Sequence, residues 1–189
     1  MDPILSIDIG GTKLAVSVVA PDGRTFSVRR TPSHAREGPE AMIARVIALA
    51  RQAQQQCALT CATAGVSIGG PLDPVSGIIL TPPNLPGWDR VPLRDMLAEP
   101  LGLAPSRVFL DNDANACALA EQRFGAARGR RHAIFLTMST GLGGGLILDG
   151  KLYRGAGFNA GEAGHQVVLP DGPLCGCGGR GCLEAVASG

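Results

Sequence analysis

The sequence predicts an α/β fold in which a meander of three antiparallel strands precedes alternating strands and helices. Apolar runs over residues 4–9, 14–19 and 25–29 are joined by short turns that contain glycine and aspartate. This spacing is typical of consecutive strands in one sheet. A dinucleotide-binding fold would instead alternate strand and helix from its first element.

Alternating elements follow the meander. Residues 39–56 have the apolar period of a helix, carried by Met42, Val46, Leu49 and Ala53. A proline-rich stretch over residues 81–88 is expected to be an ordered loop. Further strands are expected at 62–68, 107–110, 133–138 and 146–148, and further helices at 91–99 and 113–124. This order predicts a ribonuclease H-like α/β fold of the actin and hexokinase superfamily, with an N-terminal domain over residues 1–122 and the start of an incomplete second domain over 123–189.

Composition and charge argue against several classes of function. The chain of 189 residues is 45% hydrophobic, enough to fill a core, and its formal net charge of +1 includes no long basic run. No basic segment followed by an apolar stretch opens the chain, and no apolar run approaches the length of a membrane span. We therefore expect a cytoplasmic protein without a nucleic-acid or membrane partner.

Three thiols and one imidazole near the end of the chain form the full ligand set of a tetrahedral zinc site. They are His165, Cys175, Cys177 and Cys182, and glycines between the cysteines let the backbone turn tightly. Four protein ligands leave no position for water, so the predicted Zn²⁺ is structural. The alternative is three unrelated buried cysteines and one surface histidine.

The other three cysteines are Cys57, Cys61 and Cys117. Their apolar surroundings predict small buried hydrophobic residues. Free thiols and a thiolate metal site fit a reducing cytosol better than a secreted disulfide scaffold.

Two glycine-rich segments follow predicted strands and suit phosphate binding. In the first, Asp8 precedes a turn made of Gly10, Gly11, Thr12 and Lys13; the second contains Thr140, Gly141, Gly143 and Gly144. Amides in such turns form an anion-binding concavity, and the Asp8 carboxylate offers a ligand for Mg²⁺. Two such segments suggest a nucleotide phosphate held between two domains. The alternative for the first is an ordinary hairpin turn.

Three carboxylates lie at positions where a catalytic or ligand-binding role is expected. Asp113 lies where a strand feeds a helix and could accept the proton of an attacking hydroxyl; the alternative is helix capping. Glu162 comes three residues before His165, and Glu184 comes two residues after Cys182. A metal-bound loop would hold both glutamates in place.

These motifs together resemble the ROK family of sugar kinases and repressors. The resemblance covers nearly the whole chain and is carried by residues 8–13, 84–88, 112–115, 141–145, 161–165 and 175–184. The cysteine motif, Cys-Gly-Cys-Gly-Gly-Arg-Gly-Cys-Leu-Glu, is the most specific of them.

The resemblance implies a glucokinase-like hexose kinase that uses ATP and Mg²⁺, with Asp113 as general base. It implies sugar contacts from Gly70, Asn84, Asn112, Asp113, Glu162, His165 and Glu184, with one ring nitrogen of His165 for the metal and one for the sugar. The two glycine-rich segments would hold the phosphates. Phosphoryl transfer needs mainly positioning and charge neutralisation, which this layout supplies.

The sequence departs from the family pattern after residue 189, where family members continue with helices that usually supply a dimer surface. A homo-oligomer is therefore possible but not predicted. The chain begins with its first strand rather than the helix-turn-helix of the repressors, which argues against DNA binding. Two alternatives stay open: a non-catalytic sugar-binding module or regulator fragment, and a zinc-dependent structural fragment. The sequence does not identify the hexose, nor ATP rather than polyphosphate as donor.

Overall fold

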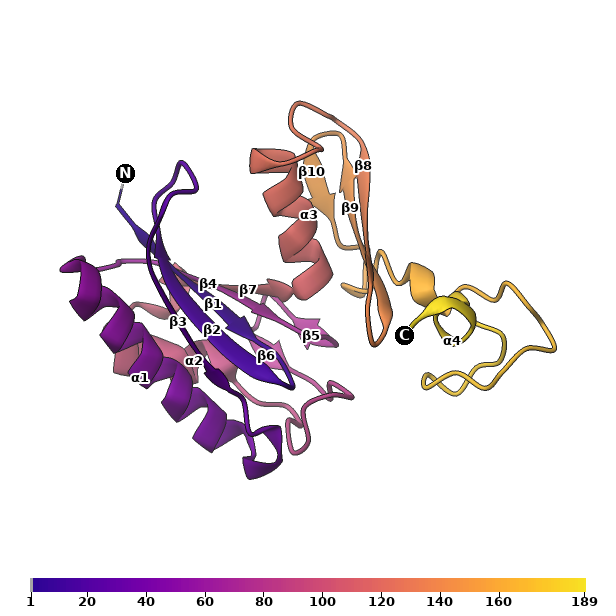
Figure 1. The fold of residues 1–189 in the computed structure, drawn as a ribbon, viewed down its shortest axis with the longest axis horizontal. Helices are drawn as coiled ribbons and strands as arrows, with labels where there is room; N and C mark the ends of the chain where they lie inside the picture. Colours follow the sequence, from indigo (N-terminus) through magenta and orange to yellow (C-terminus); the bar gives the residue numbers. More distant parts are fainter. Residues whose placement is uncertain (1) are drawn as a thin grey trace. The chain divides into compact units, whose positions relative to one another are not determined.

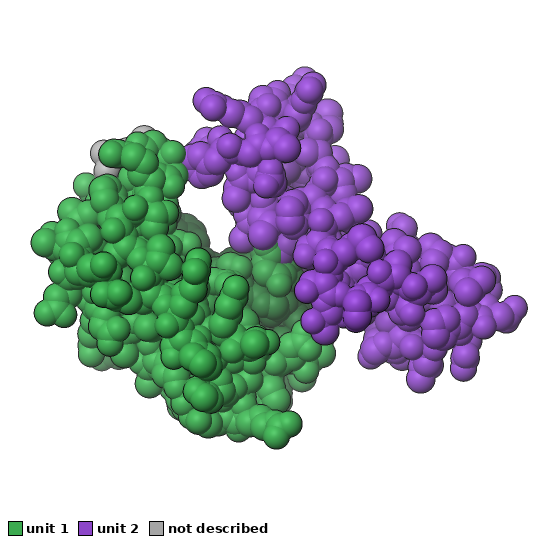
Figure 2. Space-filling view, viewed as in Figure 1, with its two compact units in different colours: residues 1–113 green, residues 114–189 purple. Residues whose placement is uncertain are grey.

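The structure is a computed structural model that describes residues 2–189 and divides into two compact units (Figures 1 and 2). Unit 1 covers residues 1–113 and unit 2 covers residues 114–189. The sequence analysis placed the boundary between residues 122 and 123, which assigned the helix after Asp113 to the first domain. That helix packs on the sheet of unit 2, and this packing is why the structural division comes earlier.

Unit 1 is built on a five-stranded mixed sheet. Its strands are β1 (Ile4–Ile9), β2 (Lys13–Val19), β3 (Thr25–Pro32), β4 (Ala64–Ile68) and β7 (Val108–Asn112), in the order β3-β2-β1-β4-β7. The first three strands pair antiparallel, as the predicted meander requires, while β4 runs parallel to β1 and β7 parallel to β4. The mixed sheet therefore agrees with the predicted fold class.

Two helices cover one face of this sheet, α1 (Pro39–Cys57) and α2 (Leu93–Ala98) (Figure 1). Helix α1 begins with proline at its first position, where the missing amide costs no hydrogen bond. The four residues of its predicted stripe are buried, as are alternate residues of β1: Leu5, Ile7 and Ile9. Short 3₁₀ turns stand at η1 (Ala35–Glu37), η2 (Glu99–Leu101) and η3 (Pro105–Arg107).

A small hairpin that sequence reasoning missed follows β4. It consists of β5 (Leu72–Asp73) and β6 (Ile78–Ile79), strands too short to show a two-residue alternation. Arg94, on α2, holds the turn of this hairpin to the rest of unit 1. Its guanidinium donates to the carbonyls of Pro74 at 2.7 Å, Val75 at 2.6 Å and Val108 at 3.2 Å.

Unit 2 starts with α3 (Asp113–Phe124), whose first residue belongs to unit 1. The helix lies against an antiparallel sheet of β8 (Ala133–Met138), β9 (Leu142–Leu148) and β10 (Lys151–Tyr153) (Figure 1). A Cβ atom at Gly145 would lie 2.6 Å from the Ala114 carbonyl oxygen, so glycine permits this close packing. Beyond β10 the chain is mostly irregular, with η4 (Ala163–His165) and a short helix α4 (Leu183–Ala187).

Two further features bear on the sequence analysis. Cys61 is buried as expected and Cys57 is half-buried, but Cys117, on α3, is exposed, whereas its neighbour Ala118 is buried. Strand β8 also leaves Ile134, Leu136 and Met138 more than half exposed.

Among residues 2–189, no helix is long and apolar enough to cross a membrane.

Replacing Arg94 tests how the hairpin is held. We expect Arg94→Ala to destabilise the protein by about 1–3 kcal/mol, because three carbonyls lose a charged donor. This corresponds to a fall in Tm of roughly 2–12 °C, measured by circular dichroism or calorimetry. Arg107→Ala, at an exposed arginine, is the control and should leave Tm nearly unchanged. Equal Tm values for the two variants would contradict this role of Arg94.

Candidate functional site

The candidate site in unit 1 lies at the carboxyl edge of the parallel strands. Ile9 of β1 pairs with Ile68 of β4, and Ile68 pairs with Asn112 of β7, so the three strands end level with one another. The turn after β1, the Gly69–Gly70 segment after β4 and Asp113 after β7 therefore start from one edge. Ligands of open α/β sheets bind outside this edge.

Asp8 is the half-buried carboxylate of this edge. Burial raises its pKa, and the nearby Asp113 carboxylate raises it further. A hydrogen bond from Ser67 Oγ to Asp8 Oδ1 at 3.4 Å and the charge of Lys13 act in the opposite direction. A carboxylate that is costly to ionise, with a second carboxylate nearby, suits a site completed by a cation.

Two glycines bring predicted substrate-binding segments into contact. A Cβ atom at Gly11 would lie 2.7 Å from the carbonyl oxygen of Asn84, so the predicted phosphate turn touches the predicted sugar loop. A Cβ atom at Gly70 would lie 3.2 Å from the Asn112 amide nitrogen. The turn is also a true hairpin connection between β1 and β2, closed by a bond from the Gly10 amide to the Lys13 carbonyl at 3.1 Å.

Unit 1 thus brings together most of the residues predicted for its half of the site. These are Asp8, Gly10, Gly11, Thr12, Gly70, Asn84, Asn112 and Asp113. Lys13 is the first residue of β2 and is exposed, with its charge felt at Asp8.

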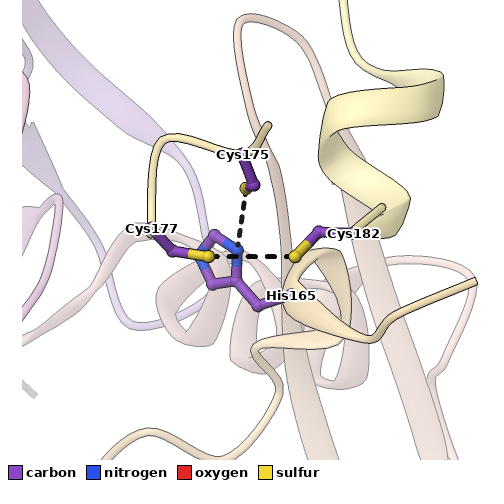
Figure 3. Close-up of side chains that lie close together, drawn as sticks. All are labelled: His165, Cys175, Cys177 and Cys182. Carbon is purple, nitrogen blue, oxygen red and sulfur yellow. Dashed lines mark hydrogen bonds between the residues drawn. The ribbon is translucent and has the colours of Figure 1, made fainter. Parts of the chain in front are cut away.

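The predicted metal ligands of unit 2 converge (Figure 3). One ligand atom from each of His165, Cys175, Cys177 and Cys182 lies within 4.8 Å of the others. The sulfurs of Cys177 and Cys182 are 3.8 Å apart, and Cys175 Sγ is 3.7 Å from His165 Nδ1. Tetrahedral Zn²⁺ with Zn–S bonds of about 2.3 Å places two sulfurs about 3.8 Å apart, so the donor set fits zinc.

The backbone around the thiols is a series of tight turns. The amide of Cys175 donates to the Gly179 carbonyl at 2.8 Å, and the Gly178 amide donates back to the Cys175 carbonyl at 2.9 Å. Gly178 has a φ of 88°, which other residues rarely adopt. The Gly179 amide donates to Cys177 Sγ at 3.4 Å and lowers the pKa of that thiol. Burial raises the pKa of the Cys182 thiol to about 11.

Both glutamates flank this cluster. His165 turns Nδ1 toward Cys175, and its Nε2 lies 3.9 Å from Glu162 Oε2. Glu184 Oε1 lies 3.8 Å from Cys175 Sγ, and its Oε2 accepts a hydrogen bond from the Leu142 amide at 2.8 Å. The Glu184 carboxylate therefore links the cluster to the turn before β9. Sequence reasoning missed this link because the two residues are far apart in the chain.

The second glycine-rich segment differs from the expected loop. Gly143 and Gly144 lie within β9, and only residues 139–141 form the turn. At Gly144 the lack of a side chain has a packing reason, since a Cβ atom there would lie 2.6 Å from the Gly161 carbonyl oxygen. Thr140 is exposed in the turn, and a Cβ atom at Gly141 would lie 2.7 Å from Glu184 Oε2. Phosphate binding at this segment remains a prediction, centred on the turn.

Comparison with known proteins identifies the family to which this chain belongs. The sequence model of the ROK family matches residues 4–189, almost the whole chain. The chain belongs to the ROK family. This agrees with the predicted ribonuclease H-like fold of the actin and hexokinase superfamily.

Three ROK proteins illustrate the similarity. A glucokinase of Thermotoga maritima is 40% identical over 185 residues, and an N-acetylmannosamine kinase of Escherichia fergusonii is 40% identical over 188 residues. The crystal structure of a ROK family glucokinase from Streptomyces griseus, in complex with glucose and AMPPNP, has a TM-score of 0.86 and 38% identity. Each alignment covers 98% of this chain but only 57%, 61% and 57% of the respective relative.

Removal of one thiol tests the metal centre of this ROK protein. We expect Cys177→Ser to lose bound zinc, because three ligands cannot close the tetrahedral shell. Zinc content after dialysis, measured by mass spectrometry, checks the result. The matched control is Cys117→Ser, at an exposed thiol outside the cluster, which should keep about one zinc per chain. Full zinc content in Cys177→Ser, or none in the unmodified protein, would contradict the assignment.

The raised pKa of Asp8 predicts a pH-dependent stability difference. Because the folded state holds the Asp8 proton more tightly, this residue costs stability as pH rises from the unfolded pKa of 3.8 through the folded value. Asp8→Asn should therefore match the unmodified Tm at pH 3 and exceed it at pH 7 by roughly 1–3 °C.

Asp22→Asn is the control of opposite sign for this experiment. The Arg24 backbone amide and guanidinium lower the pKa of Asp22, so its carboxylate favours the folded state at neutral pH. The Tm of Asp22→Asn relative to the unmodified protein should therefore not rise between pH 3 and pH 7. The interpretation of Asp8 fails if both variants respond to pH in the same way.

Proposed function

We propose that the protein is a sugar kinase that transfers a phosphoryl group from ATP to a hydroxyl of a hexose, with Asp113 as general base. One observation carries the proposal: Asp8 and Asp113 interact electrostatically at the sheet edge that also carries the glycine turn. The glucokinase and N-acetylmannosamine kinase relatives support it. Because this chain spans less than two thirds of their length, the activity remains a proposal for the whole protein.

Each residue of the edge has a role in this reaction. Asp113 would accept the proton from the sugar hydroxyl while the hydroxyl oxygen attacks the γ-phosphorus of ATP and ADP departs. The side chains of Asn84 and Asn112 and the Gly70 backbone would hold the sugar, because Gly70 already packs on Asn112. Amides of Gly10, Gly11 and Thr12 and the Lys13 ammonium would meet the phosphates, and Asp8 would be an oxygen ligand of Mg²⁺. When bound, Mg²⁺ neutralises charge on the phosphates.

The zinc cluster would act in the same function as a structural support. His165 would use Nδ1 for the metal and Nε2 for the sugar, and Glu162 beside Nε2 would contact the sugar as well. Glu184 would add a further contact, from a carboxylate already fixed by the Leu142 amide. The turn with Thr140 and Gly141 would contribute phosphate contacts from unit 2.

The comparisons and the composition support a substrate class, a phosphoryl donor and a cellular compartment. The 40% identity to both a glucokinase and an N-acetylmannosamine kinase supports a hexose or N-acetylhexosamine. The AMPPNP complex of the Streptomyces griseus glucokinase supports ATP as donor. The predicted thiolate metal site supports a reducing cytosol, and balanced charge supports the absence of a nucleic-acid partner. A homo-oligomer remains an open possibility for the whole protein.

The test is release of ADP in the presence of Mg²⁺, ATP and a panel of hexoses. Asp113→Asn should reduce kcat by about 10²–10⁴-fold, the usual contribution of a general base, while sugar affinity changes little. Asp95→Asn, at an exposed carboxylate on α2, is the control and should retain full turnover.

Sugar binding and turnover are separable activities, and the sequence analysis left a non-catalytic alternative open. In this alternative the chain is a sugar-binding module or regulator without turnover. Sugar binding by calorimetry with no ADP release from any hexose would select this function. Full activity of Asp113→Asn would reject Asp113 as the base.

A further inference from the structure

A cavity within unit 1 extends beyond the residues assigned to phosphoryl transfer. It has a volume of about 570 Å³, in the range of small-molecule sites. One side is formed by Gly11 and Thr12 of the glycine turn, and another by Asn84 and Pro86. The rest of the wall is the segment 32–37, which no motif of the sequence analysis included. Asp8 and Asp113 do not line it.

Ser33 fixes the glycine turn to this wall. The buried Ser33 donates from its amide to the Thr12 carbonyl at 3.0 Å and from Oγ to the Gly11 carbonyl at 2.5 Å. The carbonyls of Gly11 and Thr12 thereby each accept a hydrogen bond. Within residues 2–189, the amides of the same two residues donate none. The turn is held in place and offers donors rather than acceptors.

The charges of the wall are also biased toward binding an anion. Its carboxylate, Glu37, is neutralised by an ion pair with Arg45, which also donates to the Ser33 carbonyl at 3.0 Å. Arg36 and His34 line the cavity, and neither forms an ion pair within the described part of the chain. Arg36 therefore presents an uncompensated positive charge beside two amide donors.

The backbone at His34 supports a role for this segment. His34 has a φ of 48° and a ψ of 50°, a left-handed conformation that costs a non-glycine residue free energy. Its side chain is exposed on the cavity wall, so the strain is not repaid by burial of the imidazole. The left-handed turn, which histidine adopts more readily than most residues, sets the direction in which the imidazole leaves the chain at the cavity wall.

We propose that this cavity binds a phosphate group other than the one transferred, held by the Gly11 and Thr12 amides, His34 and Arg36. A guanidinium and free amides suit the several oxygens of phosphate, and the one carboxylate of the wall, Glu37, is already paired with Arg45. The phosphate belongs to an inorganic polyphosphate chain or to a sugar phosphate. The inference extends the proposed function, since Gly11 and Thr12 serve both sites, yet its test needs neither sugar turnover nor Mg²⁺.

The experiment is titration calorimetry on the whole chain with three separate ligands: tripolyphosphate, glucose 6-phosphate and sulfate. No nucleotide, free hexose or Mg²⁺ is present, so a failure of kinase activity does not affect the result. The test variant is His34→Asn with Arg36→Gln, in which asparagine tolerates the left-handed backbone. The control is Arg24→Gln, which removes an exposed arginine outside the wall.

We expect one of the phosphate compounds to bind more tightly than sulfate and to lose about tenfold in affinity in the double variant. The Arg24→Gln control should keep the original Kd. Tighter binding of tripolyphosphate identifies a polyphosphate chain as the source, and tighter binding of glucose 6-phosphate identifies a sugar phosphate. The proposal is overturned if neither binds, if sulfate binds equally well, or if the double variant and the control behave alike. A melting curve for each variant excludes unfolding as the cause.

Discussion

The arrangement of unit 1 depends on the register of its parallel strands. Because β1, β4 and β7 end level with one another, segments far apart in the sequence begin at one edge of the sheet. A slip of one residue in either pair would turn every side chain to the opposite face, burying polar residues and exposing the alternating core of β1. The core therefore fixes the register, and the register brings Asp8 and Asp113 within electrostatic reach.

Glycine supplies the second constraint, because the motif segments approach one another more closely than a Cβ atom allows. A Cβ atom would clash with the Asn84 carbonyl at Gly11 and with the Gly161 carbonyl at Gly144, and it would crowd the Asn112 amide at Gly70. Glycine-rich segments are commonly interpreted as ligand loops, yet here each also has a packing reason. The two explanations are compatible at Gly11, where the turn packs against the loop at Asn84 and still has free amides.

The sequence predicts the parts of this structure that have strong local patterns. The alternation of the first strands and the helical stripe led by Met42 identified the meander and α1, and the cysteine spacing identified the cluster. Strands β5 and β6 were missed because two residues show no period. The compact units divide earlier than the predicted boundary, because α3 follows β7 directly in the chain but packs against β9, which comes later. The Glu184–Leu142 bond and the wall around His34 had no local signal, since both depend on tertiary contacts.

The cluster of unit 2 shows which parts of the chain a structural metal would hold in place. Residues beyond β10 form little regular structure and expose several apolar side chains, so few packing contacts hold them. Without a metal, three thiols that share one small volume are a weak substitute for a core. Four metal bonds would fix His165 and the Cys175–Cys182 turn at once, and with them the carboxylates of Glu162 and Glu184. Because Glu184 also holds the Leu142 amide, order in the cluster would extend to the turn at Thr140.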